Sequence, residues 1–472
     1  MNRRRIFAVA LVALLVASLL LASCQPRTIV KEVPVKVVQT VVQEVTTNPV
    51  VIEWVAEGTN CPSLDAPGPL CAKAWAKLYM DSHPGVIVNV STISPADGTN
   101  QTMNALILSG LSPDLFFAYG GRLDAFLDYA APLPYDPALY THPAIDAWVS
   151  DDGQSLFMYP MMAWATGMTA NYTLAEELGI VDLLPALDGD RSWSVAEFEA
   201  FCEAAKAKGY PAFGVFALNG SGDYWTDSWA LGRGATLYKD NDLSQLNVNS
   251  AEWVGTYEWF TDMVSKGYML PDGWTMADET VSAEYFARRI VVGHGSPSIL
   301  VDTGDVLHAI SYPSLDGSFV PFATAPTGLL VFDSAARLRK LQSEGKTVTA
   351  EQLAEAERKR DAAVAFAVWL NTGQFPVDQV TSSYTWRADI DATPTCANCT
   401  PEQAEFAKAE RAWMDAMIAE HGLADIGVAS KYYQFVRNTK VAALAEVLQG
   451  NVSAQEALDG VVAEFNAALA EE

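Results

Sequence analysis

The chain has 472 residues, of which 50% are hydrophobic and 18% are charged. This length is enough for two or three domains, and the hydrophobic content excludes disorder over most of the chain. Asp and Glu total 57 against 30 Lys and Arg, and the formal net charge of -27 disfavours binding to nucleic acid phosphates or to anionic lipid head groups.

The N-terminus has the pattern of an export signal. Three arginines at positions 3–5 precede an apolar run over positions 6–21, which is shorter than the roughly 20 residues needed to span a bilayer. The run ends in Leu-Ala-Ser-Cys at positions 21–24, which resembles the lipobox of bacterial lipoproteins. We therefore predict that residues 1–23 are a lipoprotein signal peptide and that Cys24 carries the lipid. The sequence leaves open whether export follows the general secretory or the twin-arginine route.

Residues 24–49 are expected to form a spacer between the lipid and the folded body. Positions 25–50 contain nine valines and no glycine or aromatic residue. A short helix is the alternative, but Pro34 disfavours it. Fully extended, the spacer could reach on the order of 85 Å from its anchor.

Export permits disulfide bonds, and the body contains five cysteines. Cys61 and Cys71 flank a loop with three prolines and a glycine, so we expect a local disulfide between them. Cys396 and Cys399 lie in a polar loop that lacks the second ligand pair of a structural zinc site and the strand-to-helix setting of a redox motif. We therefore expect a tight disulfide there as well. Cys202 lies on the apolar face of a predicted helix and is expected to be a buried free thiol.

The first part of the body alternates between predicted strands and helices. Strands are expected at 50–56, 86–90 and 114–119, with helices at 71–81 and 103–108 between them. Such alternation predicts a parallel sheet covered by helices.

A second α/β unit follows an apolar run at 158–170. Ser194 with Glu197 three residues later has the pattern of a capping box, which predicts a helix at 195–208. The remaining expected elements are strands at 211–218 and 290–294, a helix at 251–266, a charged helical hairpin at 333–361, an apolar helix at 362–370, and two helices within 440–469.

The order of several segments carries a family resemblance. These segments are 74–90 with His83-Pro84-Gly85, 109–117 with Ser112-Pro113-Asp114, 159–172, 192–193 with the following helix, 257–271, 286–297, 363–370, and 444–458 around Gly450. Their sequence resembles the sugar-type extracellular solute-binding proteins of bacterial ABC importers, the family that contains maltose-binding protein. The chain departs from the family at Arg288-Arg289, where Gly-Lys is frequent, and in the length of the 333–361 stretch.

The resemblance implies a two-lobed α/β fold of the type II periplasmic-binding-protein class, with the ligand between discontinuous lobes that close by hinge bending. By position, we expect crossings between the lobes near 157–162, 313–321 and 381–388. The predicted N-terminal lobe comprises 50–158 and 321–382, and the predicted C-terminal lobe comprises 159–320 and 383–472.

A sugar ligand needs aromatic planes for its C–H faces and fixed polar groups for its hydroxyls. Ligands enter open α/β sheets at the carboxyl ends of strands, so we expect contacts from loops at 57–60, 119–122, 223–229 and 295–296, and from the third crossing. Each candidate could instead be a core aromatic, a hinge residue or part of a helix cap. The predicted ligand-binding residues are Glu57, Tyr119, Trp164, Trp225, Asp227, Trp229, Trp386, Arg387 and Tyr433.

We therefore expect a binding protein that captures a sugar or oligosaccharide and delivers it to the membrane subunits of an ABC permease. It would be a monomer held at the outer face of the cytoplasmic membrane by its N-terminal lipid. The expectation includes no catalysis, no cofactor, no metal site and no nucleic acid partner.

Two alternatives remain open from the sequence. An exported glycoside hydrolase would use paired carboxylates, such as Asp223 with Asp227 or Asp302 with Asp305, but no spacing places them across a scissile bond. The same fold could bind another polar solute, such as a glycerol phosphate or an amino-acid derivative. Because the only cations near the expected cleft are Arg122 and Arg387, we favour a neutral sugar.

Overall fold

The computed structural model describes residues 48–57, 71–93, 99–140, 143–215, 217, 223–295, 304–374, 383–389, 400–427, 430 and 432–470. All of them belong to one unit, Val45–Glu472. The predicted signal peptide and most of the spacer lie outside the described residues, as do Cys24, Cys61, Asp302, Cys396 and Cys399.

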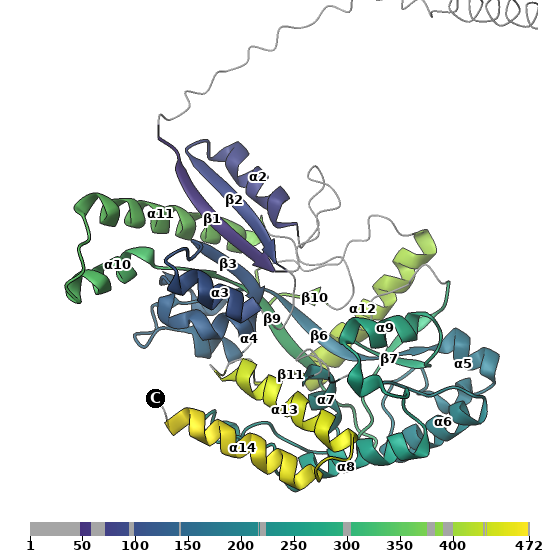
Figure 1. Cartoon of the computed structure of the whole chain (residues 1–472). Helices are drawn as coiled ribbons and strands as arrows, with labels where there is room; N and C mark the ends of the chain where they lie inside the picture. Colours follow the sequence, from purple (N-terminus) through teal and green to yellow (C-terminus); the bar gives the residue numbers. More distant parts are fainter. Residues whose placement is uncertain are drawn as a thin grey trace, which may run out of the picture. The chain divides into compact units, whose positions relative to one another are not determined.

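A mixed sheet at the centre of the fold is built from both halves of the chain (Figure 1). Strand β1 (Val50–Glu57) lies between β2 (Val86–Ile93) and β3 (Leu115–Tyr119) and pairs with both in parallel. Helices α2 (Ala72–Ser82) and α3 (Thr99–Leu108) connect these strands. The predicted alternation of strands and helices is confirmed here to within a few residues.

Two long strands continue the sheet beyond β3. Strand β9 (Phe322–Val331) pairs antiparallel with β3, and β6 (Tyr159–Asn171) pairs antiparallel with β9. The second half of β6 pairs instead with β7 (Val292–Gly295) and β8 (Leu307–Ile310). Strand β6 therefore belongs to both halves of the fold.

Short strands complete this crossing region. Strand β10 (Ser383–Tyr384) pairs antiparallel with β6, and β11 (Leu423–Asp425) pairs in parallel with β9. The crossings predicted near 157–162 and 381–388 overlap the start of β6 and β10. The crossing predicted near 313–321 ends just before β9, which is the long strand in this part of the chain.

Two separate hydrophobic cores account for the two lobes. The first core includes Tyr159, Met162 and Ala163 at the start of β6, and the second includes Met168 and Ala170 near its end. This arrangement gives the two-lobed α/β fold expected from the sequence. Trp386 packs in the first core, although the predicted boundaries assign 383–472 to the second lobe.

The second lobe is built mainly from helices around β6, β7 and β8. These are α5 (Tyr172–Leu178), α6 (Val195–Ala207), α7 (Asp223–Leu231), α8 (Ala251–Lys266) and α9 (Asp278–Phe286). Helix α6 begins with the predicted capping box between Ser194 and Glu197.

Two predictions in this lobe are wrong. The described part of the predicted strand 211–218 forms only an isolated bridge, between Phe213 and Met269, because its backbone bonds go to the neighbouring 268–270 and 291–292 segments. The segment 223–229, predicted as a loop, forms most of helix α7.

The predicted charged hairpin consists of α10 (Ser334–Ser343) and α11 (Ala350–Trp369), and α11 includes most of the predicted apolar helix. The predicted C-terminal pair consists of α13 (Tyr433–Leu448) and α14 (Ala454–Ala470). Helix α12 (Pro401–His421) was not predicted, although Thr400 and Gln403 form a capping box at its start.

Short elements fill the remaining connections. They are α4 (Gly120–Leu123), β4 (Leu133–Pro134), β5 (Ser155–Leu156), a π-helical turn at Leu370–Gln374, and 3-10 helices at Asp124–Tyr129, Pro137–Leu139, Pro143–Trp148, Val181–Leu183, Lys239–Asn241 and Gly273–Thr275.

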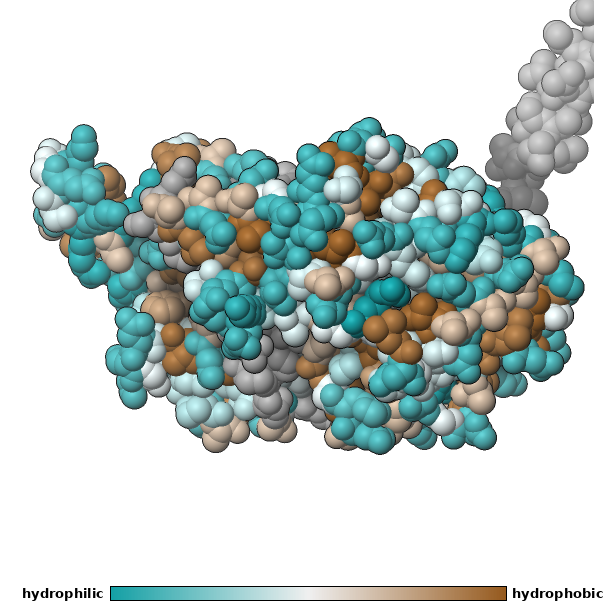
Figure 2. Space-filling view, turned by 90° about the horizontal axis from the view of Figure 1, so that it is seen from below, coloured by the Kyte–Doolittle hydropathy of each residue, from teal (hydrophilic) through white to brown (hydrophobic). Residues whose placement is uncertain are grey.

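The surface view in Figure 2 is mainly hydrophilic, with apolar residues in separate patches. Within the described residues, no helix is long and apolar enough to cross a membrane. Cys202 is a buried free thiol whose pKa is raised by burial, as expected. Cys71 is disulfide-bonded, and the pairing with Cys61 stays a prediction because Cys61 lies outside the described residues.

Candidate functional site

Three polar side chains gather where β1 and β3 end. Glu57 is the last residue of β1, Tyr119 is the last residue of β3, and Arg122 follows in α4. Glu57 forms an ion pair with Arg122 and accepts a hydrogen bond from the backbone N–H of Tyr119, at 3.2 Å. Because parallel strands present their carboxyl ends at one edge of a sheet, the fold brings these residues together as the sequence predicted.

Helix α13 brings two more side chains to this edge. The hydroxyl oxygens of Tyr119 and Tyr433 are 2.6 Å apart, and their ring centres are 5.7 Å apart. Arg437, one turn further along α13, has its guanidinium carbon 5.3 Å from the centre of the Tyr119 ring. We refer to Glu57, Tyr119, Arg122, Tyr433 and Arg437 as the interlobe cluster.

Gly121 explains how Tyr433 approaches α4 so closely. A Cβ atom at position 121 would lie 1.8 Å from the Tyr433 ring, so only glycine leaves room for the ring.

All five residues of the interlobe cluster are buried, at 2% to 6% exposed. A polar cluster buried between elements of two lobes is suited to hold a polar solute once the lobes separate.

Sequence reasoning identified Glu57, Tyr119 and Tyr433 but not the whole cluster. Arg122 was considered only as a nearby cation, and Arg437 was missed. Arg437 follows Tyr433 by four residues, a spacing that puts both side chains on one face of a helix and that could have identified Arg437 as a candidate.

The predicted candidates on α7 have a different environment. Asp227 forms an ion pair with Lys440 of α13, and both are buried, at 3% and 1% exposed. The Tyr257 hydroxyl donates to the Lys440 carbonyl at 2.9 Å, and burial, together with the charge of Asp227, raises the pKa of Tyr257. The charge of Asp227 is therefore matched within the second lobe.

Trp225 and Trp229 lie inside the second core. Their ring centres are 5.9 Å apart, and each makes an edge-on contact with Tyr312. Trp229 also lies 5.0 Å from Trp259, and both candidates are at most 1% exposed. This environment favours a packing role for Trp229 in particular.

The candidates at the third crossing pack against the first lobe. Trp386 stacks on Trp148 with ring centres 5.6 Å apart. Arg387 donates to Asp389, at 2.6 and 2.8 Å, and to the carbonyl of Asn371. The contacts with Trp148 and Asn371 tie both residues to the first lobe. The backbone of Trp164 lies in β6, and its side chain is outside the described part of the structure.

Two of the grooves in the described surface bear on where the site lies. A groove of about 590 Å³ is lined by residues that include Asp124, two positions after Arg122 in the chain, and Tyr432, directly before Tyr433. A larger groove of about 920 Å³ lies beside α10 and α11, away from the cluster. None of the predicted ligand-binding residues lines this larger groove, so we place the site at the cluster instead.

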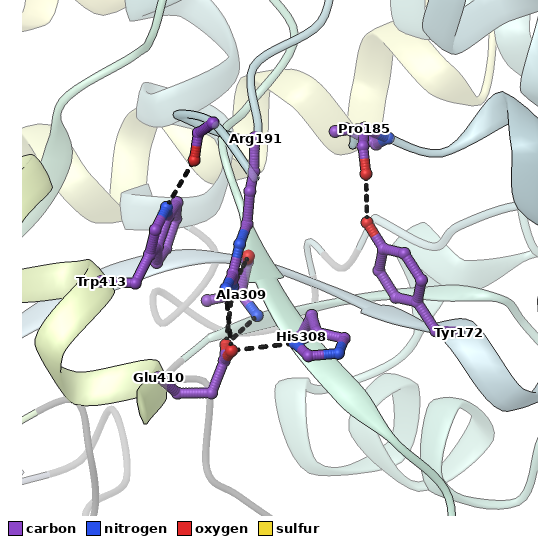
Figure 3. Close-up of polar contacts among 8 residues, drawn as sticks. Tyr172, Pro185, Arg191, His308, Ala309, Glu410 and Trp413 are labelled. Atoms are coloured by element: carbon purple, nitrogen blue, oxygen red, sulfur yellow. Dashed lines mark hydrogen bonds and ion pairs between the residues drawn. The ribbon is translucent and has the colours of Figure 1, made fainter. Parts of the chain in front are cut away.

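A second buried polar network, which the sequence did not suggest, holds α12 (Figure 3). Glu410 accepts two hydrogen bonds from Arg191, at 2.8 and 2.9 Å, and one from the backbone N–H of Ala309 at 3.1 Å. His308 Nδ1 lies 2.8 Å from the same carboxylate, and Trp413 stacks on Arg191 at 4.1 Å. Burial tends to raise the pKa of Glu410, but these hydrogen bonds outweigh it and lower the pKa below its ordinary value.

Within the described residues, no group of three or more His, Cys, Asp or Glu side chains is placed to hold a metal ion. The structure is thus a two-lobed fold with a polar, aromatic cluster between its lobes. The sequence matches the family of bacterial extracellular solute-binding proteins over residues 69–372. The chain belongs to this family. Solute-binding proteins of this family are extracellular, which agrees with the export signal expected at the N-terminus.

Solved structures confirm the fold of this solute-binding protein. An ABC substrate-binding protein from Listeria monocytogenes, in complex with cycloalternan, is 14% identical with a TM-score of 0.61, over 90% of this chain and 100% of that one. A sugar transporter from Arthrobacter chlorophenolicus with bound laminaribiose is 13% identical with a TM-score of 0.61, over 88% and 99%.

A third similar structure comes from work on xylan utilization by Caldanaerobius polysaccharolyticus. It is 15% identical with a TM-score of 0.64, over 88% of this chain and 100% of that one. At these identities the likeness establishes the fold alone. No curated protein matches the chain by sequence.

Proposed function

We propose that this solute-binding protein captures a neutral sugar or oligosaccharide between its lobes and delivers it to the membrane subunits of an ABC permease, without catalysis. The contact between Tyr119 and Tyr433 carries the proposal, because it joins the sheet edge of the first lobe to α13. Two aromatic rings beside the Glu57–Arg122 pair offer both the planes and the polar groups that a sugar needs. The bound cycloalternan and laminaribiose of two similar structures support the same solute class.

Ligand binding would work by a shift between separated and closed lobes. Since the cluster residues are buried in this structure, a sugar reaches them only when the lobes part. Its contacts with both lobes would then favour the closed state. We retain Glu57, Tyr119 and Tyr433 as ligand contacts and add Arg122 and Arg437.

We also propose a lipid anchor at the N-terminus and disulfide bonds in two loops. Cys24 would carry a lipid that holds a monomer at the outer face of the cytoplasmic membrane. Disulfides would join Cys61 to Cys71 and Cys396 to Cys399. We keep the predicted lobe boundaries as a proposal, although Tyr159, Met162 and Trp386, which they assign to the second lobe, pack in the first core.

Arg437 supports one alternative function, the binding of an acidic solute, because it adds a second cation to the cluster beside Arg122. An acidic solute, such as a sugar phosphate, would bind to both arginines.

A thermal-shift screen separates the two proposals, because a ligand raises the stability of the state that it binds. The purified chain is screened against neutral sugars, sugar phosphates and amino acids, and hits are repeated by calorimetry. A shift with neutral sugars supports the main proposal, and a shift with phosphates alone supports the alternative.

A further inference from the structure

The folded body begins at the edge of the sheet opposite the interlobe cluster. Strand β1 starts at Val50 and β3 starts at Leu115, and both run from this edge towards the cluster. Strand β9 runs antiparallel to β3, so α10, which follows β9, starts at the same edge. We refer to the surface formed here by residues 48, 108–112 and 334–361 as the entry surface. A partner that contacts this surface leaves the interlobe cluster free.

One groove joins the three parts of the entry surface. The groove of about 920 Å³ is lined by Asn48, by Gly110 and Ser112 of the loop before β3, and by residues of α10 and α11. The Arg358 guanidinium donates a hydrogen bond to the carbonyl oxygen of Asn48 at 3.2 Å. The N-terminal segment that we propose to be anchored in the membrane therefore joins the body at the entry surface.

The loop before β3 exposes two leucines on this surface. Leu108 is 83% exposed and Leu111 is 70% exposed, the largest exposed fractions among the bulky hydrophobic side chains of the described residues. Positions 99–112, which include both leucines, contain no charged residue. Leucine side chains gain hydrophobic free energy when they move from water into the interface of a bilayer, so this uncharged loop is suited to contact a membrane.

The hairpin of α10 and α11, which extends beyond the sheet in Figure 1, has an excess of positive charge. Residues 334–361 include seven Lys or Arg and five Asp or Glu, whereas the whole chain has a net charge of -27. Four of these cations form ion pairs with carboxylates. Among the described residues, no carboxylate forms an ion pair with Arg337, Lys340 or Lys346. The hairpin also has two carboxylates outside these ion pairs, Glu344 and Glu351.

These charges indicate which kind of membrane the entry surface fits. Anionic head groups attract Lys and Arg at short range, and salt screens charges that lie further away than about 10 Å. The local excess of cations therefore counts for more at a membrane surface than the net charge of the chain. The net charge opposes binding of a free chain from solution, but an anchored chain is already held at the surface, where weak contacts suffice.

We propose that the entry surface rests on the anionic head groups of the membrane that anchors the chain. Leu108 and Leu111 lie in the interface, and Lys340 and Lys346 contact the head groups. The inference rests on the proposed N-terminal anchor. The opposite edge of the sheet, with the interlobe cluster, then faces away from the membrane surface.

The test locates two matched positions relative to the bilayer. The full lipidated chain is reconstituted in vesicles with a fluorophore at Ser109→Cys, on the entry surface, or at Ser265→Cys, on α8 of the second lobe. Both serines are exposed, and each hydroxyl donates to the carbonyl three residues earlier. Cys202 is buried, and the unsubstituted chain gives the background labelling. Quenching by a lipid with a nitroxide on its head group reports which position lies at the membrane.

We expect stronger quenching at position 109 than at position 265 in vesicles of phosphatidylcholine with phosphatidylglycerol. The difference should fall in phosphatidylcholine alone and at about 1 M salt, where the Debye length is about 3 Å. Equal quenching at the two positions overturns the inference. A difference that grows with the density of the chain on the vesicles also overturns it, because it indicates a second copy as the partner.

Charge variants test the contact with the head groups. Lys340→Glu with Lys346→Glu should lower the ratio of docked to undocked chain by at least about tenfold. Lys239→Glu with Lys408→Glu makes the same charge change at exposed positions of the second lobe and should leave the ratio unchanged.

Leucine variants test the contact with the interface. Leu108→Ser with Leu111→Ser should also lower the ratio by at least about tenfold, because two apolar side chains no longer leave water. Leu183→Ser with Leu315→Ser, at residues of the second lobe that are 42% and 63% exposed, is the control. Thermal unfolding checks that each variant is folded.

Sugar binding separates this inference from the proposed sugar capture. None of the substituted residues belongs to the interlobe cluster, so calorimetry should find wild-type sugar affinity in every double variant. An unchanged ratio in either entry-surface variant overturns the inference and leaves sugar capture intact. A chain that does not stay on the vesicles overturns the proposed anchor and the inference with it.

Discussion

At the scale of single residues, the hydroxyl oxygens of Tyr119 and Tyr433, 2.6 Å apart, link the two lobes in the candidate site. Tyr119→Phe and Tyr433→Phe keep the rings and remove one hydroxyl each. A hydrogen bond of this kind contributes about 1 kcal/mol, so calorimetry should find sugar affinity lowered by roughly five- to tenfold. Tyr129→Phe, at a residue that is 44% exposed, is the control. Unchanged affinity in both cluster variants would place the ligand elsewhere.

A second prediction at the scale of single residues concerns Gly121. In Gly121→Ala the new methyl group overlaps the Tyr433 ring, which must move. We expect an unfolding free energy lower by about 1–3 kcal/mol, as for other overpacked sites, together with weaker sugar binding. In Gly189→Ala the methyl group meets nothing within 4 Å, so both quantities should stay at their wild-type values. A Gly121→Ala chain with wild-type stability would show that the close approach of Tyr433 to α4 does not contribute to the stability of the fold.

Residue identity alone could not separate ligand contacts from core packing. Glu57 and Tyr119 were predictable because they end strands of a parallel sheet, where side chains converge. Trp229 has the same chemistry as a stacking platform, yet the packing of α7 against α8 puts it 5.0 Å from Trp259. Burial of this kind depends on contacts between distant segments, and no local pattern reports it.

At the scale of elements, a buried ion pair joins α7 to α13. Removing the negative charge in Asp227→Asn leaves Lys440 buried without its counter-charge, so the unfolding free energy should fall by about 3–5 kcal/mol. The double variant Asp227→Asn with Lys440→Met should recover part of the loss, because no buried charge remains. Chemical denaturation measures both. Loss of sugar binding without loss of stability in Asp227→Asn would instead support the original prediction that Asp227 contacts the ligand.

Helix α12 depends on Glu410 in the same way. Glu410→Gln should lower the unfolding free energy by about 3–5 kcal/mol, because Arg191 is buried against the carboxylate. Since the pKa of Glu410 is lower in the folded chain than its ordinary value of 4.5, its contribution is present above pH 4.5 and is lost as the pH falls through the lowered pKa. Denaturation at a series of pH values should therefore show less acid destabilisation in Glu410→Gln than in the wild type. Glu402→Gln, in the exposed first turn of α12, is the control, and equal acid profiles for wild type and Glu410→Gln would contradict this account.

Elements with a strong local pattern were the predictable ones. Helix α8 was predicted over the 16 residues that form it, and the capping box of α6 marked its start. The described part of the predicted strand at 211–218 has apolar residues but a single bridge, between Phe213 and Met269, so tertiary contacts decide its form. Helix α12 carried a capping box at Thr400 that was overlooked.

At the scale of the whole molecule, β6 connects the two lobes that flank the proposed site. Its first half packs in one core and its second half in the other, so a small change along this strand can alter the distance between the lobes. The family resemblance, rather than composition, predicted this arrangement. The sequence could not show which side chains would meet between the lobes, because that depends on how α13 returns to the sheet edge.

The most direct measurement is a calorimetric titration of the full chain with neutral sugars, with analysis of the sugar afterwards. We predict saturable binding of an unaltered sugar, weakened in Tyr119→Phe and Tyr433→Phe and unchanged in Tyr129→Phe. Absence of binding by every neutral sugar, or recovery of a hydrolysed product, would contradict the account.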